Sequence, residues 1–244
     1  MIQQPSSRAV AGWRPQGFGR ANAHGIRDPL IEPLWIGRRV LVRIDAGETS
    51  VVDEAGVAIH GAGAGAATPG DAAEAADIGD MIDAVRRATR ADAVVLDGYL
   101  TRQATMPPRP VPIGEVRTLG AGELTAQMFL GRRARHNELV EEAATVAAVE
   151  ASDSPIAFVA VDLIEIDGLA LLDVPLLERK RILESAIQPG ELVRIGPYVR
   201  PPVDPWLGTW RALGFTSVAY KAANGRYFPG APNDGWARAR IPNS

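Results

Sequence analysis

The chain has 244 residues, of which 46% are hydrophobic and 23% charged, values typical of a globular protein with a substantial core. Its formal net charge of −3 provides no overall positive field for nucleic acid, and the absence of cysteine excludes disulfides and thiolate zinc sites. No apolar run is long enough to span a bilayer, and the N-terminus lacks the apolar core of a signal peptide. We therefore expect a cytoplasmic protein without a membrane partner.

Residues 1–27 are rich in glycine, arginine and serine and show no hydrophobic periodicity, which predicts a flexible N-terminal arm. Residues 28–244 are expected to form one domain. The arm carries four arginines with Trp13 and Phe18, which could contact nucleic acid. Arms of this kind more often lie over their own domain or are disordered than contact nucleic acid.

Two strands are predicted next, over residues 35–44 and 49–59, joined as a hairpin by Asp45-Ala46-Gly47. Residues 61–70 form a loop of small residues. Their GAGAG run lacks the lysine and the strand-to-helix context of a phosphate-binding loop, so no such site is predicted there.

A helix over residues 71–91 and a buried strand over residues 94–100 follow. Four prolines predict a surface loop over residues 103–115. Residues 123–150 are expected to hold one or two helices. Their basic cluster is our candidate for contacting nucleic acid, although such clusters more often form a solvated face. It consists of Arg132, Arg133, Arg135 and His136.

The stretch from residue 158 to residue 187 is the most informative in the chain. Its apolar first half predicts a buried strand, Asp167-Gly168 predicts a tight turn, and Pro175 suits the start of a helix with one apolar face. Lys180 falls on the polar side of that helix and is expected to be solvated. Further strands are predicted over residues 191–199 and 215–221, with a proline-rich link over 198–205.

The sequence FVAVDLIEIDGLALLDVPLLERK resembles a motif of the ATP-dependent DNA ligases, usually written FDLLYLDG followed by LLDLPLLERR. Four further motifs lie in the family's order, so that the resemblance covers roughly residues 28–241. IEPLWIGRRVL resembles the nucleophile motif EPKxDGxRVL, VVLDGYL the strand ending in DGE, TSVAYK the EGLVAK strand, and WARAR the closing WLKVK.

The resemblance implies an α+β domain with the nucleotidyltransferase fold of a ligase adenylation domain, which is ATP-grasp-like. That fold has two mainly antiparallel sheets flanked by helices, with a nucleotide cleft between them. The hairpin-compatible strands favour antiparallel sheets independently. Because the sequence ends a few residues after WARAR, we expect no OB-fold domain.

The groups that would carry the family's chemistry are replaced. Its reaction begins when a lysine amine attacks the α-phosphate of ATP, and the matching position is Leu34, whose side chain has no lone pair. The other replacements are Ile36 for the aspartate of the same motif, Glu54 for the arginine of an RxG turn, Tyr99 for the glutamate of DGE, Val161 for the aromatic stacked on adenine, and Thr216 for the glutamate of EGLVAK. We therefore expect no catalytic residue and no metal ligand at this site.

Positive charge persists at four positions that the resemblance makes candidates for contacting nucleotide or phosphate: Arg39, Lys221, Arg238 and Arg240. ATP with magnesium, weakly bound, is thus the only cofactor left open. Lys180 and Lys221 are the only lysines in the chain, and Lys221 is the only serious candidate for a relocated nucleophile.

Three hypotheses follow. The first is a catalytically degenerate ligase-like domain that does not self-adenylate and has a binding or scaffold role, with a competent ligase or another DNA-repair protein as partner. The second is an active polynucleotide ligase or nucleotidyltransferase with a relocated nucleophile. The third is a protein that binds nucleic-acid ends through its arm and its basic cluster. We favour the first, without enzyme activity, because the fold-building parts of the motifs persist while their chemical groups are replaced.

Overall fold

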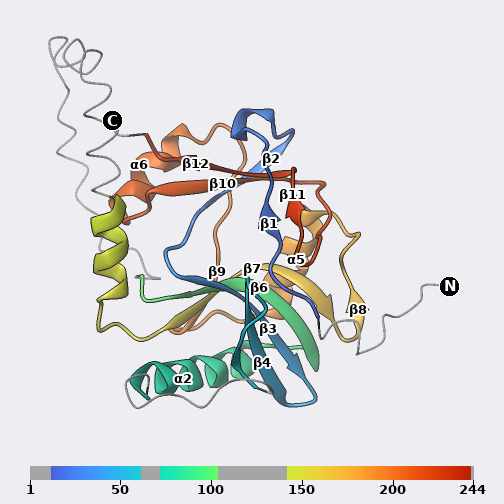
Figure 1. The fold of residues 1–244 in the computed structure, drawn as a ribbon. Coiled ribbons are helices and arrows are strands. Elements are labelled where there is room, and N and C mark those ends of the chain that lie inside the picture. The colour runs from blue at the N-terminus through green and yellow to red at the C-terminus, as the bar shows by residue number, and fades with distance from the viewer. Residues whose placement is uncertain (1–11, 62–71, 104–141, 243–244) are drawn as a thin grey trace, which may run out of the picture.

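The computed structural model describes residues 12–61, 72–103 and 142–242, and it consists of two stacked sheets with helices around them (Figure 1). The large sheet contains β3 (Arg38–Asp45), β4 (Glu48–Asp53), β5 (Ala58–His60), β6 (Ala93–Thr101), β7 (Ala157–Ile166), β8 (Leu169–Ala170) and β9 (Val193–Ile195). The small sheet contains β2 (Pro29–Pro33), β10 (Ser217–Ala222) and β12 (Trp236–Arg240). The short strands β1 (Gly17–Phe18) and β11 (Pro232–Asn233) form a separate pair.

The helices are α2 (Ala72–Ala88), α5 (Leu176–Ala186) and α6 (Asp204–Ala212), with a 3-10 turn η1 (Ala23–Gly25). Residues 142–150 are also helical. In the described ranges, no helix is long and apolar enough to cross a membrane.

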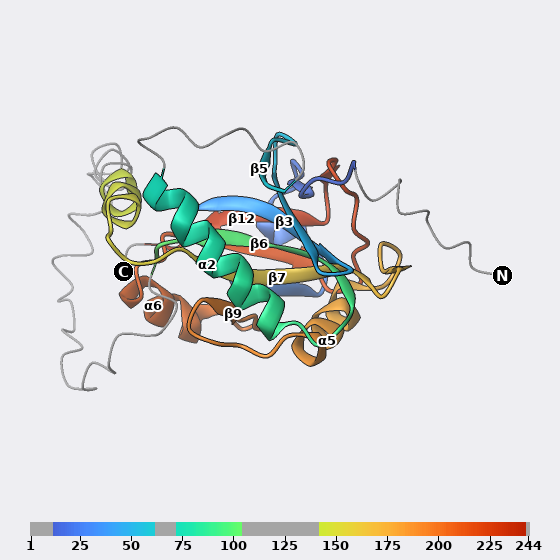
Figure 2. The same cartoon turned by 90° about the horizontal axis from the view of Figure 1, so that it is seen from below.

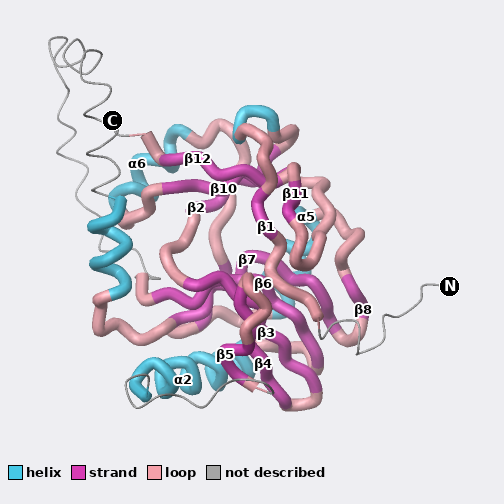
Figure 3. Tube along the Cα trace, viewed as in Figure 1, coloured by secondary structure: helices cyan, strands magenta, loops and turns pink. Residues whose placement is uncertain are grey.

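The strand order is β5-β4-β3-β6-β7-β8 in the large sheet and β12-β10-β2 in the small one (Figure 3). All neighbours in these two orders are antiparallel, whereas β9 pairs with β7 in parallel and β1 with β11 in parallel. The predicted architecture of two mainly antiparallel sheets flanked by helices is therefore confirmed.

The predicted first hairpin is present, but its second strand is shorter than expected. Ala46 and Gly47 have φ values of 47° and 84°, which turn the chain from β3 into β4. The Asp53 carboxylate then accepts hydrogen bonds from the main-chain N–H groups of Ala55 and Val57, at 2.9 and 2.8 Å. This side-chain turn ends β4 and starts a second hairpin into β5.

Helix α2 lies across the outer face of the large sheet (Figure 2). Its apolar residues recur at helical spacing, as predicted, and are buried with alternate residues of the central strands. These residues are Ile78, Met81, Ile82 and Val85 of the helix, with Val40, Val42, Leu96 and Phe158 of the sheet. The opposite face of the large sheet therefore faces the small sheet (Figure 1).

The predicted strand, turn and helix over residues 158–187 are confirmed as β7, a turn with Asp167 at φ 47°, and α5. The prediction that Lys180 is solvated is wrong, because its side chain is completely buried. The reason is that α5 is covered on more than its apolar side. The first turn of α5 docks on the loop that follows β10, where the N–H of Leu176 donates to the Gly225 carbonyl at 3.0 Å.

Residues 12–27 are the described part of the expected flexible arm, and their strand β1 pairs with β11 in the chain between β10 and β12. The N–H groups of Gly17 and Gly19 donate to the carbonyls of Ala231 and Asn233 at 3.0 and 2.9 Å. Gln16 is completely buried. Figure 1 shows this segment running beside β11 between the levels of the two sheets.

Candidate functional site

Three of the positions that the resemblance assigns to catalysis, Leu34, Tyr99 and Val161, come together in one apolar cluster. Tyr99 and Val161 are buried members of this cluster, and the half-buried Leu34 packs against the cluster. The other buried members are Ile31, Trp35, Val159, Trp210, Phe215, Val218 and Ile241. Strands of both sheets and α6 contribute, so this cluster is the apolar part of the core between the sheets.

Tyr99 cannot replace the carboxylate expected at its position. It lies opposite Arg39 in the β3–β6 pair. Burial raises the pKa of Tyr99 to about 12, although the Arg39 charge acts against this. The phenol is therefore neutral at physiological pH.

The other three replaced positions lie outside this cluster. Ile36 is buried, and its main-chain N–H donates to the Gln103 side chain at 3.1 Å. It borders a cavity of about 410 Å³ whose wall also includes Gly37 and Thr101. Glu54 is exposed in the turn after β4, and Thr216 is half-buried just before β10.

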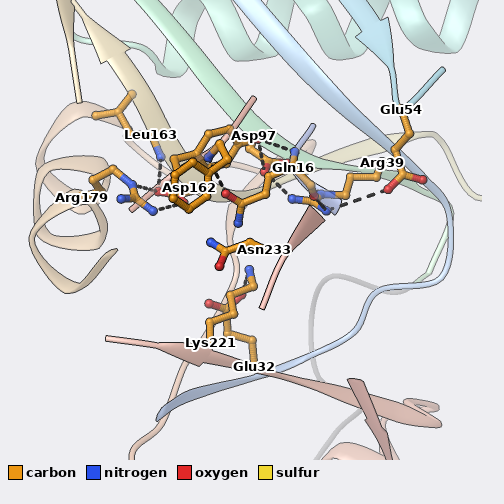
Figure 4. A network of polar contacts seen from close by, with 12 residues as sticks. Gln16, Glu32, Arg39, Glu54, Asp97, Asp162, Leu163, Arg179, Lys221 and Asn233 are labelled. Atoms are coloured by element: carbon orange, nitrogen blue, oxygen red, sulfur yellow. Dashed lines mark hydrogen bonds and ion pairs between the residues drawn. The ribbon is translucent and has the colours of Figure 1, made fainter. Parts of the chain in front are cut away.

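Arg39 is retained from the nucleophile motif, but it is buried and neutralised (Figure 4). Its guanidinium donates twice to the Asp97 carboxylate, Nε to Oδ1 at 3.0 Å and Nη2 to Oδ2 at 2.5 Å. The Tyr227 hydroxyl also donates to this carboxylate, at 2.8 Å, and the Gln16 carbonyl accepts from Arg39 Nη1. Burial lowers the pKa of Arg39, but the charge and hydrogen bonds of Asp97, together with the nearby Tyr99 and Tyr227, outweigh burial and raise that pKa.

Asp162, retained beside the position of the adenine-stacking aromatic, makes a second buried pair. Arg179 of α5 donates to both of its carboxylate oxygens, at 2.9 and 2.8 Å, and both side chains are completely buried. This bidentate pair fastens α5 to β7.

Glu32 of β2 forms a third buried charge cluster, with both lysines of the chain. Lys180 Nζ lies 2.8 Å from Oε1, and Lys221 Nζ lies 2.9 Å from Oε2. Burial would raise the pKa of Glu32, but the two ammonium groups outweigh it and lower that pKa. Burial also lowers the pKa of Lys221, against the attraction of Glu32, and the charge of Lys180 adds to the lowering.

Trp236 connects the buried cations. Its side chain is completely buried, the Arg39 guanidinium lies 5.1 Å from its ring centre, and Lys221 Nζ lies 4.2 Å from it. Cations at these distances from an indole are attracted by the ring. One aromatic side chain thus contacts charged groups of both sheets.

Arg238 and Arg240, the other two candidates for phosphate contact, are exposed on β12. The guanidinium of Arg238 lies 4.2 Å from the ring centre of Phe18. Arg240 Nη2 lies 2.7 Å from a carboxylate oxygen of Glu142. The Phe18 ring centre also lies 5.9 Å from the Arg39 guanidinium and 5.8 Å from the Trp236 ring centre. Three of the four candidates, Arg39, Lys221 and Arg238, are therefore grouped around these two rings, whereas Arg240 pairs with Glu142. The nucleic-acid candidates Arg132, Arg133 and Arg135 lie outside the described residues.

The glycines retained from the motifs have a structural explanation. A Cβ at Gly37, which has φ 144°, would lie 2.1 Å from the Leu100 carbonyl oxygen. A Cβ at Gly98 would lie 2.4 Å from both the Phe158 ring and the Val159 carbonyl oxygen. Close approach of strands therefore requires glycine at both positions.

Our sequence interpretation missed three residues of the buried polar network: Gln16, Glu32 and Tyr227. The burial of Glu32 could have been predicted from the sequence, because Glu32 is the only charged residue within the run LIEPLWI. A charged residue in an apolar strand generally needs a buried partner. Gln16 and Tyr227 lie in segments without periodicity and had no such signal. Among the described residues, no group of three or more histidines or carboxylates is placed to hold a metal ion.

No protein-family model and no curated protein matches the sequence. Among solved structures, the fold is similar to the ligase domain of M. tuberculosis LigD, with 19% identity and a TM-score of 0.56 over 94% of this chain. It is similar to the same extent to mycobacterial DNA ligase D complexed with ATP and MES, with 20% identity, a TM-score of 0.56 and 94% coverage. The match covers 60% of each of those two chains. The chain therefore has the fold of a DNA ligase domain, as its motifs predicted.

Proposed function

We propose that this chain is a catalytically degenerate DNA ligase-like domain that does not form an enzyme–AMP intermediate and has a binding or scaffold role. The observation that carries the proposal is the apolar cluster of Leu34, Tyr99 and Val161. The family's reaction begins with attack of a lysine amine on the α-phosphate of ATP, and none of these three side chains carries an amine.

The retained motif residues support the same proposal. Arg39, Asp162 and Lys221 each satisfy a buried charge of opposite sign. Buried charges need such partners whether or not the protein is an enzyme. Retention of these residues is therefore explained by the fold alone, whereas the replaced positions are those that the chemistry would need.

A relocated nucleophile is the alternative within the enzyme class, and Lys221 is its candidate. Burial lowers the pKa of Lys221, which favours the reactive neutral amine. However, its side chain is only 4% exposed and is held by Glu32. An amine in this position has no access to the α-phosphate of ATP unless the sheets separate.

The binding role is proposed from the ligase-like fold and from the surface. Arg238 and Arg240 are exposed on the same strand and offer guanidinium groups for weak binding of ATP or nucleic-acid phosphates. A competent ligase or another DNA-repair protein is the proposed protein partner.

Incubation with α-labelled ATP and magnesium tests the proposal. We expect no covalent label on the chain and no sealing of a nicked duplex, under conditions in which a competent ligase is labelled and seals. An acid-labile label on the intact chain would disprove the proposal. A label lost in Lys221→Arg would instead establish the relocated nucleophile.

Binding of nucleic-acid ends is tested by gel shift with nicked and blunt duplexes at increasing salt. Phosphate contacts predict affinity that falls steeply as salt rises. The double substitution Arg238→Gln and Arg240→Gln should weaken the shift if these two residues contribute. Absence of a shift at low salt would exclude this binding role.

A further inference from the structure

Residues 13–20, here called the N-terminal strap, lie between the levels of the two sheets (Figure 1). Gln16 of the strap is completely buried. Its carbonyl oxygen accepts a hydrogen bond from Arg39 Nη1, and its N–H donates to the Tyr227 hydroxyl at 2.9 Å. The side chain of Gln16 is directed toward Lys221 and the small sheet (Figure 4). The strap therefore reaches the buried polar network from within.

The Phe18 ring of the strap lies among positive charges that the ligase resemblance assigns to phosphate contact. Its centre is 4.2 Å from the Arg238 guanidinium and 5.9 Å from the Arg39 guanidinium. The Trp236 ring, which contacts Lys221, has its centre 5.8 Å from that of Phe18. The strap thus occupies the position at which three of the four candidate cations gather.

Positive charge exceeds negative charge around the strap. Asp97 balances Arg39, but the single carboxylate of Glu32 faces both lysines. Arg238 has no carboxylate within ion-pair distance in the part of the chain that the structure describes. The strap sequence WRPQGFGR contains no acidic residue, so it offers these cations main-chain carbonyls and a ring face instead of counter-charge. An anion would be attracted to the same position, because the surplus positive charge is partly shielded from water there.

Hydrogen bonds at both ends hold the strap in place. The Arg14 carbonyl accepts from the Gly230 N–H at 2.9 Å, and the Arg20 N–H donates to Asp234 Oδ1 at 3.1 Å. The backbone is packed closely at Gly19, where a Cβ would lie 2.4 Å from Asp234 Oδ1 and 2.5 Å from Asp234 Cα. A segment held this closely excludes other groups from the space that it fills.

We propose that the N-terminal strap is an autoinhibitory element, which occupies a latent anion site formed by Arg39, Lys221, Arg238 and Trp236. The chemical class of ligand that the strap excludes is a polyphosphate, because ligand and strap need the same space. The inference rests on the proposed function for the identification of these cations as remnants of a phosphate site. It adds a steric barrier to the loss of the amine at Leu34.

Isothermal titration calorimetry with inorganic tripolyphosphate tests the proposal on the unmodified chain and two variants. Gly19→Ala displaces the strap by a clash with Asp234 and keeps the ring of Phe18. Phe18→Ala removes the ring and keeps the strap backbone. Each variant should bind at least ~10-fold more tightly than the unmodified chain, because the apparent affinity is no longer reduced by displacement of the strap.

Two matched controls should leave the affinity unchanged. A Cβ at Gly12 would meet no atom within 4 Å, so Gly12→Ala leaves the strap in place. Phe228 is 45% exposed, so Phe228→Ala removes a ring that does not fill the site. Circular dichroism establishes which variants are folded, and the comparison uses those.

The gained affinity should depend on the cations around the strap. Adding Arg238→Gln to Gly19→Ala should abolish the gain, whereas adding Arg38→Gln, which removes an arginine with a 50% exposed side chain, should not. Affinities of the folded variants within about twofold of the unmodified chain would overturn the proposal, as would a gain that survives Arg238→Gln. Such a result leaves the missing amine of Leu34 unaffected, whereas a covalent AMP label would disprove the proposed function whatever these affinities are.

Discussion

Lys180 and Lys221 approach the two oxygens of the same carboxylate, Glu32, at 2.8 and 2.9 Å. The three side chains connect α5 with β2 and β10, and they enclose one more positive charge than negative. Buried ions lose their hydration, and only close pairing offsets this cost. Glu32 therefore supplies the counter-charge for both buried lysines.

Replacing Glu32 with glutamine should destabilise the fold strongly. Glu32→Gln leaves two buried ammonium groups without a counter-charge, which typically costs about 3–5 kcal/mol. Urea denaturation measures the free energy of unfolding. The matched control is Glu178→Gln, which removes an exposed pair with Arg181 and should change stability by less than about 0.5 kcal/mol. Equal effects of the two substitutions would contradict this role of Glu32.

Trp236 should matter more for stability than another tryptophan of the same protein. Its side chain is completely buried beside Arg39 and Lys221, so Trp236→Ala should cost about 3–5 kcal/mol. Trp206 on α6 is 47% exposed, and Trp206→Ala should cost less than about 1 kcal/mol. The same urea experiment compares the two variants. A larger loss for Trp206→Ala would refute the placement of Trp236 between the sheets.

Tyr99→Phe should make the protein more resistant to alkali. Burial raises the pKa of Tyr99 from 10.0 to about 12, so the folded chain retains a proton that the unfolded chain loses first. Below pH 10.0, the pKa of this tyrosine in the unfolded chain, its ionisation does not affect the free energy of unfolding. Between that pH and about 12, its pKa in the folded chain, the free energy of unfolding falls by roughly 1.4 kcal/mol per pH unit. Urea midpoints at about pH 9 and 11 should therefore differ less in Tyr99→Phe than in the wild type. If the urea midpoints of the two proteins changed equally between these pH values, the pKa of Tyr99 would be that of an ordinary tyrosine.

Hydrophobic periodicity was sufficient to predict the elements that bury one apolar face. The helix α2, the strands β6 and β7 and the first hairpin were predicted on that basis. It failed for α6, which begins at Asp204 within a proline-rich stretch, and for the five-residue strand β2 between Pro29 and Pro33. Prolines occur both at loops and at the ends of helices and strands, so composition alone could not separate these cases.

Lys180 shows why the site was only partly predictable. Its position on the polar side of α5 predicted exposure to solvent. Hydrophobic periodicity shows whether a residue is polar, but it does not show which residue a polar side chain pairs with. The partner, Glu32, is distant in sequence and was identified only through the contact of α5 with the small sheet. Likewise, motif comparison identified Leu34, Tyr99 and Val161 one by one, but only the packing of the sheets shows that they form one apolar cluster.

We propose that the apolar surroundings of Leu34, and not only its missing amine, prevent self-adenylation. Labelling of Leu34→Lys with α-labelled ATP and magnesium, beside the wild type, tests this claim most directly. An introduced lysine would lie among apolar neighbours without the carboxylate expected at Tyr99. Our account predicts that neither chain becomes labelled, whereas a covalent AMP label on a folded Leu34→Lys chain would contradict it.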